Sequence, residues 1–232
     1  MMLTFSDTTE EEQLFHARQV VKYWEYCKEM VVRRKQQLGD DFPSDLVRLQ
    51  QEGYEISDQE IAAMCYNQLF AGHETTTSLM GNGIRELLKE RHNWEKICHD
   101  PSLIPGAIEE ILRFNPSVIT WRRKATEEAT IGGFTFPKGA NILLLMGSGN
   151  RDEAVFENGE TLDIERKNAK EHLSFGSGIH YCLGAPLAKL EFKIVLEELT
   201  QRIPNLHLTP NQTFEFAYNT SFRAPVALEV EW

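Results

Sequence analysis

The chain has 232 residues, of which 41% are hydrophobic and 25% charged, and its formal net charge is −11. This acidic balance argues against a nucleic-acid backbone or an anionic membrane surface as the main partner. The hydrophobic and charged fractions are ordinary for a globular protein and argue against wholesale disorder. The length favours one domain or a modest two, and we expect a single domain over residues 1–232.

The cysteine content and the first residues of the chain indicate a cellular compartment. The chain contains four cysteines: Cys27, Cys65, Cys98 and Cys182. None of them pairs with another at a metal-ligand spacing such as C-x-x-C. Asp7 and the acidic residues 10–12 stand where a signal peptide needs an apolar segment. The longest fully apolar run, residues 142–146, is far too short to cross a bilayer. We therefore expect reduced thiols and a cytoplasmic location without membrane contact.

Two helices are predicted at the start of the chain. Apolar side chains recur at spacings near three and four from Phe15 to Val31, which predicts a helix over residues 1–38. Gly39 and the residues after it end that helix. A short second helix is expected over residues 44–51.

The third predicted helix combines a clear start signal with an unusual middle. Ser57 and Glu60 match a capping box and open a helix that reaches about residue 91. Its middle is mostly apolar or small, so we expect it to be buried through the core. It contains Gly72, which costs about 1 kcal/mol relative to alanine, and three threonines at 75–77, which are mediocre helix formers. Such a break in the local rules inside a buried helix marks a candidate functional site.

The second half of the chain mixes helices with short strands. Pro116 closes one helix, and Gly132-Gly133 marks the turn of a β-hairpin. In chain order we expect a helix over 103–114, a hairpin over 129–136, an apolar strand or helix over 142–146, an irregular segment over 150–172, a helix over 186–202 and a strand pair over 214–232.

The strongest motif is the loop Phe175-Gly-Ser-Gly-Ile-His-Tyr-Cys-Leu-Gly184, in which three glycines surround one cysteine directly before a helix. Glycine permits positive φ and close approach to a bulky ligand. The loop can aim amide N–H groups at the sulfur, and the helix dipole adds roughly 0.3–1 kcal/mol in favour of a thiolate. The alternatives are a buried structural cysteine and a nucleophilic cysteine, for which only His180 stands nearby as a base.

This loop resembles the signature of the cytochromes P450, F-x-x-G-x-[H/R]-x-C-x-G, and matches it at every defined position. The resemblance implies that Cys182 ligates the iron of a haem (iron protoporphyrin IX) and promotes O–O cleavage. It also implies that Phe175 and Gly176 lie beside the haem and that His180 contacts a propionate. A plain core aromatic and a solvated loop histidine are the alternatives for Phe175 and His180.

Glu110 and Arg113 form the sequence E-x-x-R and share one helix face. In isolation such a pair would be a surface ion pair worth almost nothing. The resemblance instead implies a buried structural pair of the haem site, tied to an arginine or asparagine in the irregular segment before the cysteine loop. Residues 150–152, Asn-Arg-Asp, match the opening of that segment. Residues 158–164 depart from the family's pattern, because they lack the prolines and the phenylalanine that are usual there.

Two further motifs imply haem contacts. Arg123 matches a position that reaches a haem propionate, with Arg122 beside it as the alternative. Residues 71–76, Ala-Gly-His-Glu-Thr-Thr, resemble the oxygen-activation motif of the family.

In that motif the resemblance places Ala71 and Gly72 against the haem. Thr75 can turn its hydroxyl onto the carbonyl of Ala71 and open a groove for dioxygen and water. Glu74 would conduct protons to it, which is general acid chemistry. An ordinary threonine cluster and an ion-paired Glu74 are the alternatives.

The resemblance further implies a substrate pocket, which would be lined by Leu69, Val118, Ile119, Tyr218 and Asn219. The expected fold is mostly α with a small β portion. It corresponds to the C-terminal, haem-bearing part of the cytochrome P450 fold, and the N-terminal elements are missing. The chain would then be a natural truncation, one half of a split protein or an engineered fragment.

The function implied is insertion of one oxygen atom of dioxygen into a small apolar substrate. Electrons would come from a ferredoxin-type donor, since no flavin domain follows, and a second chain is a candidate source of the missing half. The alternative is a haem-binding fragment without coupled activity, either peroxidase-like or inert. A cysteine hydrolase is a third class, which would show no haem band at all.

Overall fold

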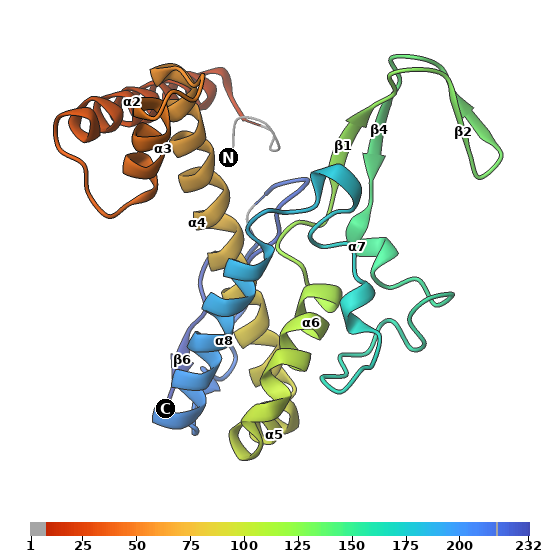
Figure 1. The fold of residues 1–232 in the computed structure, drawn as a ribbon. Helices are drawn as coiled ribbons and strands as arrows, with labels where there is room; N and C mark the ends of the chain where they lie inside the picture. The colour runs from red at the N-terminus through yellow and green to blue at the C-terminus, as the bar shows by residue number, and fades with distance from the viewer. Residues whose placement is uncertain (1–7, 217) are drawn as a thin grey trace. The chain divides into compact units, whose positions relative to one another are not determined.

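The computed structural model describes residues 8–216 and 218–232 and is mostly helical with small sheets, as expected (Figure 1). The chain divides into two compact units, Met1–Glu74 and Thr75–Trp232, which are described separately below. The single domain over residues 1–232 stays a prediction. Within the described residues, no helix combines the length and the apolar character needed to cross a membrane.

The N-terminal unit contains α2 (Glu10–Gln36), α3 (Phe42–Gln51) and the first part of α4 (Asp58–Lys89). The beginning of the predicted helix over 1–38 lies outside the described residues. The helix α3 starts two residues earlier than expected, because Asp41 accepts a hydrogen bond from the Ser44 amide (3.0 Å) and acts as its N-cap. One apolar cluster forms the core of this unit, with these buried members: Cys27, Val31, Leu46, Val47, Ile61, Ala62 and Cys65.

The predicted capping box of α4 is confirmed. The Ser57 amide donates to Glu60 Oε2 (2.8 Å), and the Glu60 amide donates to Ser57 Oγ (3.2 Å). The expectation of a buried middle is wrong, because Leu69 is 48% exposed and residues 71–73 are exposed as well. The buried apolar residues of α4 lie toward its two ends, where each end joins the core of its own unit. The helix continues without interruption through residues 72–75.

The C-terminal unit is built around α6 (Ile104–Phe114) and α8 (Ala185–Arg202), which pack against each other (Figure 1). Its core includes Ile108, Ile111, Phe192 and Leu196. The 3-10 turn η1 (Pro101–Leu103) leads into α6. Before it stands α5 (Arg91–His99), a short helix that the sequence analysis missed. It is held by two fully buried residues, Trp94 and Ile97, and the Trp94 Nε1 donates to the carbonyl of Pro204 (2.8 Å).

A close approach between α4 and α8 fixes α8, whose N-terminal end carries the cysteine loop. A Cβ atom placed on Gly83 would lie 2.3 Å from Cζ of Phe192 and 3.0 Å from Cγ2 of Ile111. Phe192 is fully buried and therefore has no room to move away. Glycine at position 83 is thus required by packing and not by backbone conformation.

The variant Gly83→Ala is expected to lower the free energy of unfolding by about 1–3 kcal/mol, because overpacking outweighs the better helix propensity of alanine. Denaturant unfolding measures this. Gly81→Ala is the matched control on the same helix, since a Cβ there meets only Pro225 Cγ at 3.9 Å, an ordinary contact. That control should be neutral or stabilising by up to about 1 kcal/mol. Equal stability of the two variants would contradict the packing argument.

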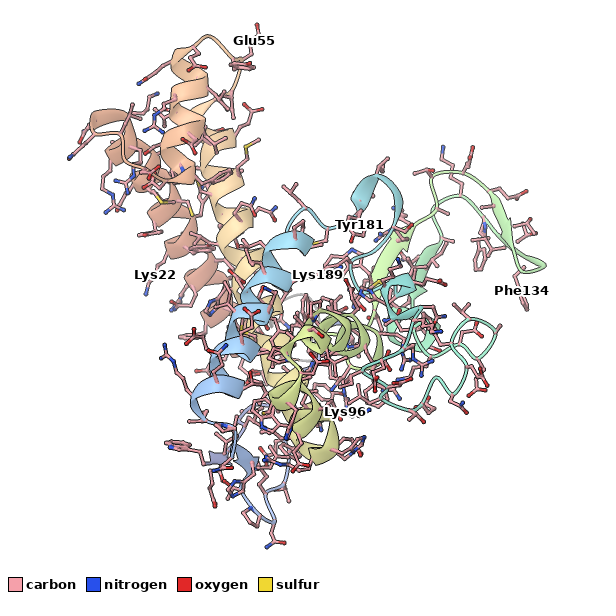
Figure 2. The ribbon with its side chains drawn as sticks, turned by 60° about the horizontal axis from the view of Figure 1, so that its bottom comes forward. Lys22, Glu55, Lys96, Phe134, Tyr181 and Lys189 are labelled. Atoms are coloured by element: carbon pink, nitrogen blue, oxygen red, sulfur yellow. The ribbon has the colours of Figure 1, made fainter. Side chains whose placement is uncertain are left out.

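Within the part of the chain that the structure describes, the strands form three two-stranded antiparallel sheets. The strand β1 (Trp121–Lys124) pairs with β4 (Asn141–Leu144), and β2 (Ala129–Ile131) pairs with β3 (Phe134–Phe136). The turn of the second pair is at Gly132-Gly133 as predicted, with φ of 58° and 84°. This hairpin extends away from the rest of its unit, with Phe134 at its end (Figures 1 and 2).

Two β predictions are refined by the structure. The ambiguous run over residues 142–146 is a strand, β4, followed by the single turn α7 (Met146–Gly149). The strand pair expected over 214–232 is only partly right. The ladder joins β6 (Val230–Glu231) to β5 (His207–Leu208), which precedes the predicted range. Inside that range, Phe216 and Pro225 form an isolated bridge, because Pro225 has no amide hydrogen to extend a ladder.

Candidate haem-binding site

The cysteine loop lies in the chain between the 3-10 turn η2 (Ala169–Glu171) and α8. Figure 2 labels Tyr181 in this loop and Lys189 on α8. The Cys182 amide donates to the carbonyl of Phe175 (2.9 Å), which closes the loop. Gly176 and Gly178 have φ of 73° and 68°, which side chains other than glycine rarely adopt. A short 3-10 turn, η3 (Gly178–His180), forms the outer part of the loop.

Cys182 is exposed and stands immediately before α8, so it is not a buried structural cysteine. Apolar side chains around it are exposed too, with Ile179 at 99% and Leu183 at 85%. Gly184 lies close to the sulfur, and a Cβ atom placed on it would meet Cys182 Sγ at 3.9 Å, an ordinary contact distance. Among the described residues no hydrogen bond reaches Sγ. The expected amide donors are therefore not aimed at the sulfur, and no His180–Cys182 nucleophile pair is formed.

The loop fits a haem group by the chemistry it offers. A single thiol faces outward at the N-terminal end of an 18-residue helix, where the helix dipole favours a bound thiolate. Glycines leave room for a flat ligand, and the exposed apolar side chains match the apolar face of a porphyrin. The described part of the chain contains no cluster of three or more His, Cys, Asp or Glu placed to hold a metal ion. The loop thus offers one cysteine sulfur as a ligand for the iron.

The pair Glu110–Arg113 is fully buried, which rules out the surface interpretation. Arg113 donates Nε to Glu110 Oε2 and Nη2 to Glu110 Oε1, both at 2.7 Å. Its remaining N–H groups reach the backbone carbonyls of Asn150 (2.8 Å), Gly159 (2.8 Å) and Thr161 (3.0 Å). All five donors of the guanidinium are therefore satisfied.

Glu110 is bound as completely as its partner. The Asp163 amide donates to Glu110 Oε1 (2.9 Å), and Arg166 Nε lies 3.2 Å from the same oxygen. Arg166 and Asn150 are thus the arginine and asparagine of the irregular segment that hold the pair. The carboxylate and the guanidinium fix the path of residues 150–166 without any regular secondary structure there. The role of Glu110 and Arg113 in the haem site itself stays a prediction.

Asn150 connects this network to the cysteine loop, a role that the sequence analysis did not assign. It is fully buried, and its Oδ1 accepts from the Leu173 amide (2.7 Å) while its Nδ2 donates to Ser174 Oγ (2.8 Å). The hydroxyl of Ser174 in turn donates to the carbonyl of Leu112 on α6. Since Phe175 follows directly, the first residue of the loop is fixed through Asn150. The match of residues 150–152 to Asn-Arg-Asp was the sequence feature that could have pointed to this role of Asn150.

A second cluster holds Phe175 from the side of α8, and it was also missed. Lys189 Nζ lies 2.7 Å from Glu109 Oε1 and 5.4 Å from the centre of the Phe175 ring. His172 Nε2 lies 3.2 Å from Glu109 Oε2, and its ring packs 5.7 Å from that of Phe175. Burial favours the neutral carboxyl, but the hydrogen bonds from His172 and Lys189 outweigh it and hold the pKa of Glu109 below its usual range. Glu109 thus stays ionised between its two partners.

The remaining predicted haem-contact residues are spread over several elements and both units. Arg123 lies on β1 opposite Ile142, is exposed, and donates Nη1 to the carbonyl of Arg122 (2.9 Å). His180 is exposed in η3. Ala71, Gly72 and Glu74 belong to the N-terminal unit, and Thr75 begins the other. The haem and proton-delivery roles of these residues stay predictions.

The structure brings together the two predicted wall segments of the C-terminal unit. The Ile119 amide donates to the carbonyl of Ser221 (2.8 Å), and Val118 forms a bridge with Phe222. Asn219 Oδ1 accepts from the amides of Ser221 and Phe222 and so shapes the turn next to Tyr218. Leu69, the fifth predicted pocket residue, lies in the N-terminal unit. Their contact with a substrate stays a prediction.

Comparisons with known proteins identify the family of the chain. The family model of cytochrome P450 matches residues 2–222. The polyketide biosynthesis cytochrome P450 PksS of Bacillus subtilis is 37% identical over 203 residues, which are 87% of this chain and 50% of the relative. The mycinamicin IV hydroxylase/epoxidase of Micromonospora griseorubida is 33% identical over 99% of this chain and 58% of its own length. The chain thus spans about half the length of the curated relatives it matches.

Solved structures give the same result. Cytochrome P450 CREJ, in complex with (4-ethylphenyl) dihydrogen phosphate, matches with a TM-score of 0.97 and 52% identity over 100% of this chain and 57% of its own. The haem domain of the Tepidiphilus thermophilus P450 matches with a TM-score of 0.93 and 39% identity over 100% of this chain and 56% of its own. Haem is the cofactor that the family implies. The chain belongs to the cytochrome P450 family.

Proposed function

We propose that this protein is a haem-thiolate monooxygenase that inserts one oxygen atom of dioxygen into a small apolar substrate. The observation that carries the proposal is the exposed thiol of Cys182, set in a glycine loop at the start of α8. Membership of the cytochrome P450 family supports it, as does a relative named steroid C26-monooxygenase from Mycolicibacterium smegmatis, 37% identical over 80% of this chain. Bound haem would supply the dioxygen chemistry.

The residues of the chain contribute binding and orientation. Cys182 would hold the iron from the side of α8, and the exposed apolar groups of Ile179 and Leu183 would keep water away from the iron–sulfur bond. The networks around Asn150 and Glu109 fix Phe175 and so set the position of the loop. A loop held at both ends keeps the sulfur in place without reorganisation, which is how a protein preorganises a ligand.

Thr75 and Glu74 would deliver protons to the reacting oxygen. The threonine hydroxyl would position a water molecule, and the carboxylate would connect it with solvent. A ferredoxin-type protein would supply the electrons one at a time. These roles rest on the match of residues 71–76 to the oxygen-activation motif.

The variant Thr75→Ala should uncouple electron consumption from product formation. We expect product formation to fall roughly 10²-fold, the usual contribution of a positioned proton donor, while peroxide release rises. Product, peroxide and NAD(P)H consumed are measured together. Thr75→Ser, which keeps the hydroxyl, is the matched control and should retain most of the coupling. Unchanged coupling in Thr75→Ala would exclude this role.

The substrate class can be tested with a compound that a relative binds. CREJ, 52% identical to this chain, was solved with (4-ethylphenyl) dihydrogen phosphate, which joins a small apolar ethylphenyl group to a phosphate that is ionised at neutral pH, so its turnover tests recognition of the ethylphenyl part. We choose it as the probe for the predicted walls at Val118, Ile119, Tyr218 and Asn219.

The deciding experiment combines a spectrum with turnover. Holoprotein is reduced under carbon monoxide to detect thiolate ligation, then supplied with ferredoxin, reductase, NAD(P)H and the probe. A thiolate band and product matching the electrons consumed support the proposal. A band with peroxide only supports the alternative of haem binding without coupled activity. Turnover that requires a separately expressed N-terminal half identifies a second chain, and absence of any haem band refutes the proposal.

A further inference from the structure

A buried polar cluster joins α4, beyond Thr75 along the helix, to the end of α6. It includes Asn82 (0% exposed), Glu86 (5%) and Asn115 (5%). Asn115 Nδ2 donates to Glu86 Oε1 (3.0 Å), and the same oxygen is ion-paired with Arg85, whose side chain is only 13% exposed. The cluster therefore places a charge pair in the interior, where polar groups must be matched to be tolerated.

The cluster binds the backbone of two distant segments. Asn82 Nδ2 donates to the carbonyl of Arg223 (2.7 Å), near the C-terminus, and lies 3.4 Å from the carbonyl of Asn115, at the end of α6. Each segment continues directly into one of the predicted substrate walls. The helix α4 thus anchors both walls at one place.

Arg85 adds a second anchor on the C-terminal segment. Its guanidinium lies 5.2 Å from the ring centres of both Phe214 and Phe216. The guanidinium of Arg223 lies 4.2 Å from the centre of the Phe216 ring as well. Such cation–π contacts are strongest where water is excluded, and Phe216 stands just before the turn at Tyr218. We call Arg85, Glu86 and Phe216 the α4 clamp.

The two walls are joined to each other beyond the clamp. The Arg223 amide donates to the carbonyl of Ser117 (2.9 Å), and the Ile119 amide donates to the carbonyl of Ser221 (2.8 Å). A displacement of one wall therefore displaces the other. Since Arg85 is ten residues from Thr75 on one helix, the clamp stands about 15 Å along the axis from the predicted proton-delivery residue.

We propose that Arg85 and Glu86 are positioning residues that set where the substrate walls at 118–119 and 218–219 stand relative to Thr75. The inference rests on the proposed function and adds a determinant of substrate affinity and of the position of oxidation. Within the described residues, Arg85 Nε and Asn82 Oδ1 are buried without a hydrogen-bond partner. A buried pair that leaves such groups unmatched is a poor way to gain stability, so its main contribution is geometric.

The test uses holoprotein carrying the double variant Arg85→Met with Glu86→Gln. This change removes both charges, keeps similar volumes and retains an acceptor for Asn115. The matched control is Arg91→Met, because Arg91 also donates to C-terminal backbone carbonyls, those of Pro204 and Leu206, but away from the walls. The reduced carbon monoxide spectrum verifies folding and thiolate ligation in each variant.

The first readout is hydrogen exchange at the amides of Ile119 and Arg223, which does not depend on catalysis. We expect exchange to accelerate roughly tenfold or more in the double variant, because local opening becomes easier, and to stay unchanged in Arg91→Met. The second is turnover of (4-ethylphenyl) dihydrogen phosphate. A wall displaced by about 1 Å lowers product formation up to 10²-fold and raises the dissociation constant of the probe.

The outcomes separate the two proposals. Arg85→Lys keeps the ion pair but not the planar stacking, so its exchange and turnover should lie between wild type and the double variant. If the double variant does not fold, the exchange and turnover of Arg85→Lys test the inference instead. Wild-type exchange and wild-type product formation in the double variant would overturn the inference. If no variant turns over, the proposed function fails, while the exchange rates still support or refute the clamp.

Discussion

Replacement of Cys182 by alanine is expected to abolish the thiolate-type carbon monoxide band of the reduced protein. Cys182 is the exposed cysteine, while Cys27 and Cys65 are buried and Cys98 is partly buried. Burial raises the pKa of each of these three thiols, which disfavours the thiolate that an iron ligand requires. None of them can replace the lost ligand, so the band should vanish in Cys182→Ala and in Cys182→His.

The measurement is the reduced carbon monoxide difference spectrum of protein loaded with haem, together with haem content per chain. Cys98→Ala is the matched control, since Cys98 belongs to the same unit but contributes to the core. It should keep the band at full intensity. A thiolate band that persists in Cys182→Ala would show that the ligand has been assigned to the wrong residue.

Local chemistry made several elements predictable. The capping box at Ser57 and Glu60 and the turn at Gly132-Gly133 depend on residues within a few positions of one another, so the sequence contains all the information. The start of α8 was predictable for the same reason, because Pro186 stands in its first turn. The signature around Cys182 identified the loop, because Gly176 and Gly178 are needed for the local backbone conformation and not for contacts with distant residues.

Tertiary packing decided what the sequence could not show. The helix α5 is short and rich in polar residues, and it is held by Trp94, whose partner Pro204 lies more than a hundred residues away. The middle of α4 looked apolar enough to be buried, yet Leu69 is exposed because burial follows the arrangement of each unit's core. The role of Asn150 requires knowing that Arg113 and Ser174 meet around it. Pairing at such separations leaves no periodic signal.

The buried pair gives the largest expected effect on stability. Arg113→Met should lower the free energy of unfolding by about 3–5 kcal/mol, because it leaves the fully buried carboxylate of Glu110 without its main partner. It also frees the carbonyls of Asn150, Gly159 and Thr161, which then lack a donor in the interior. Denaturant unfolding and haem content per chain measure the loss.

A double variant separates the pair from the network around it. Glu110→Gln with Arg113→Met removes both charges, so it should cost less than the sum of the two single changes, as expected when each single change strands a buried charge. Lys96→Met breaks the exposed pair with Glu165 and should leave stability unchanged within error. If Arg113→Met were as harmless as Lys96→Met, the pair would not hold the segment that leads to the cysteine loop. A stable Arg113→Met protein that loses haem would instead show that the pair acts on the site without supporting the fold.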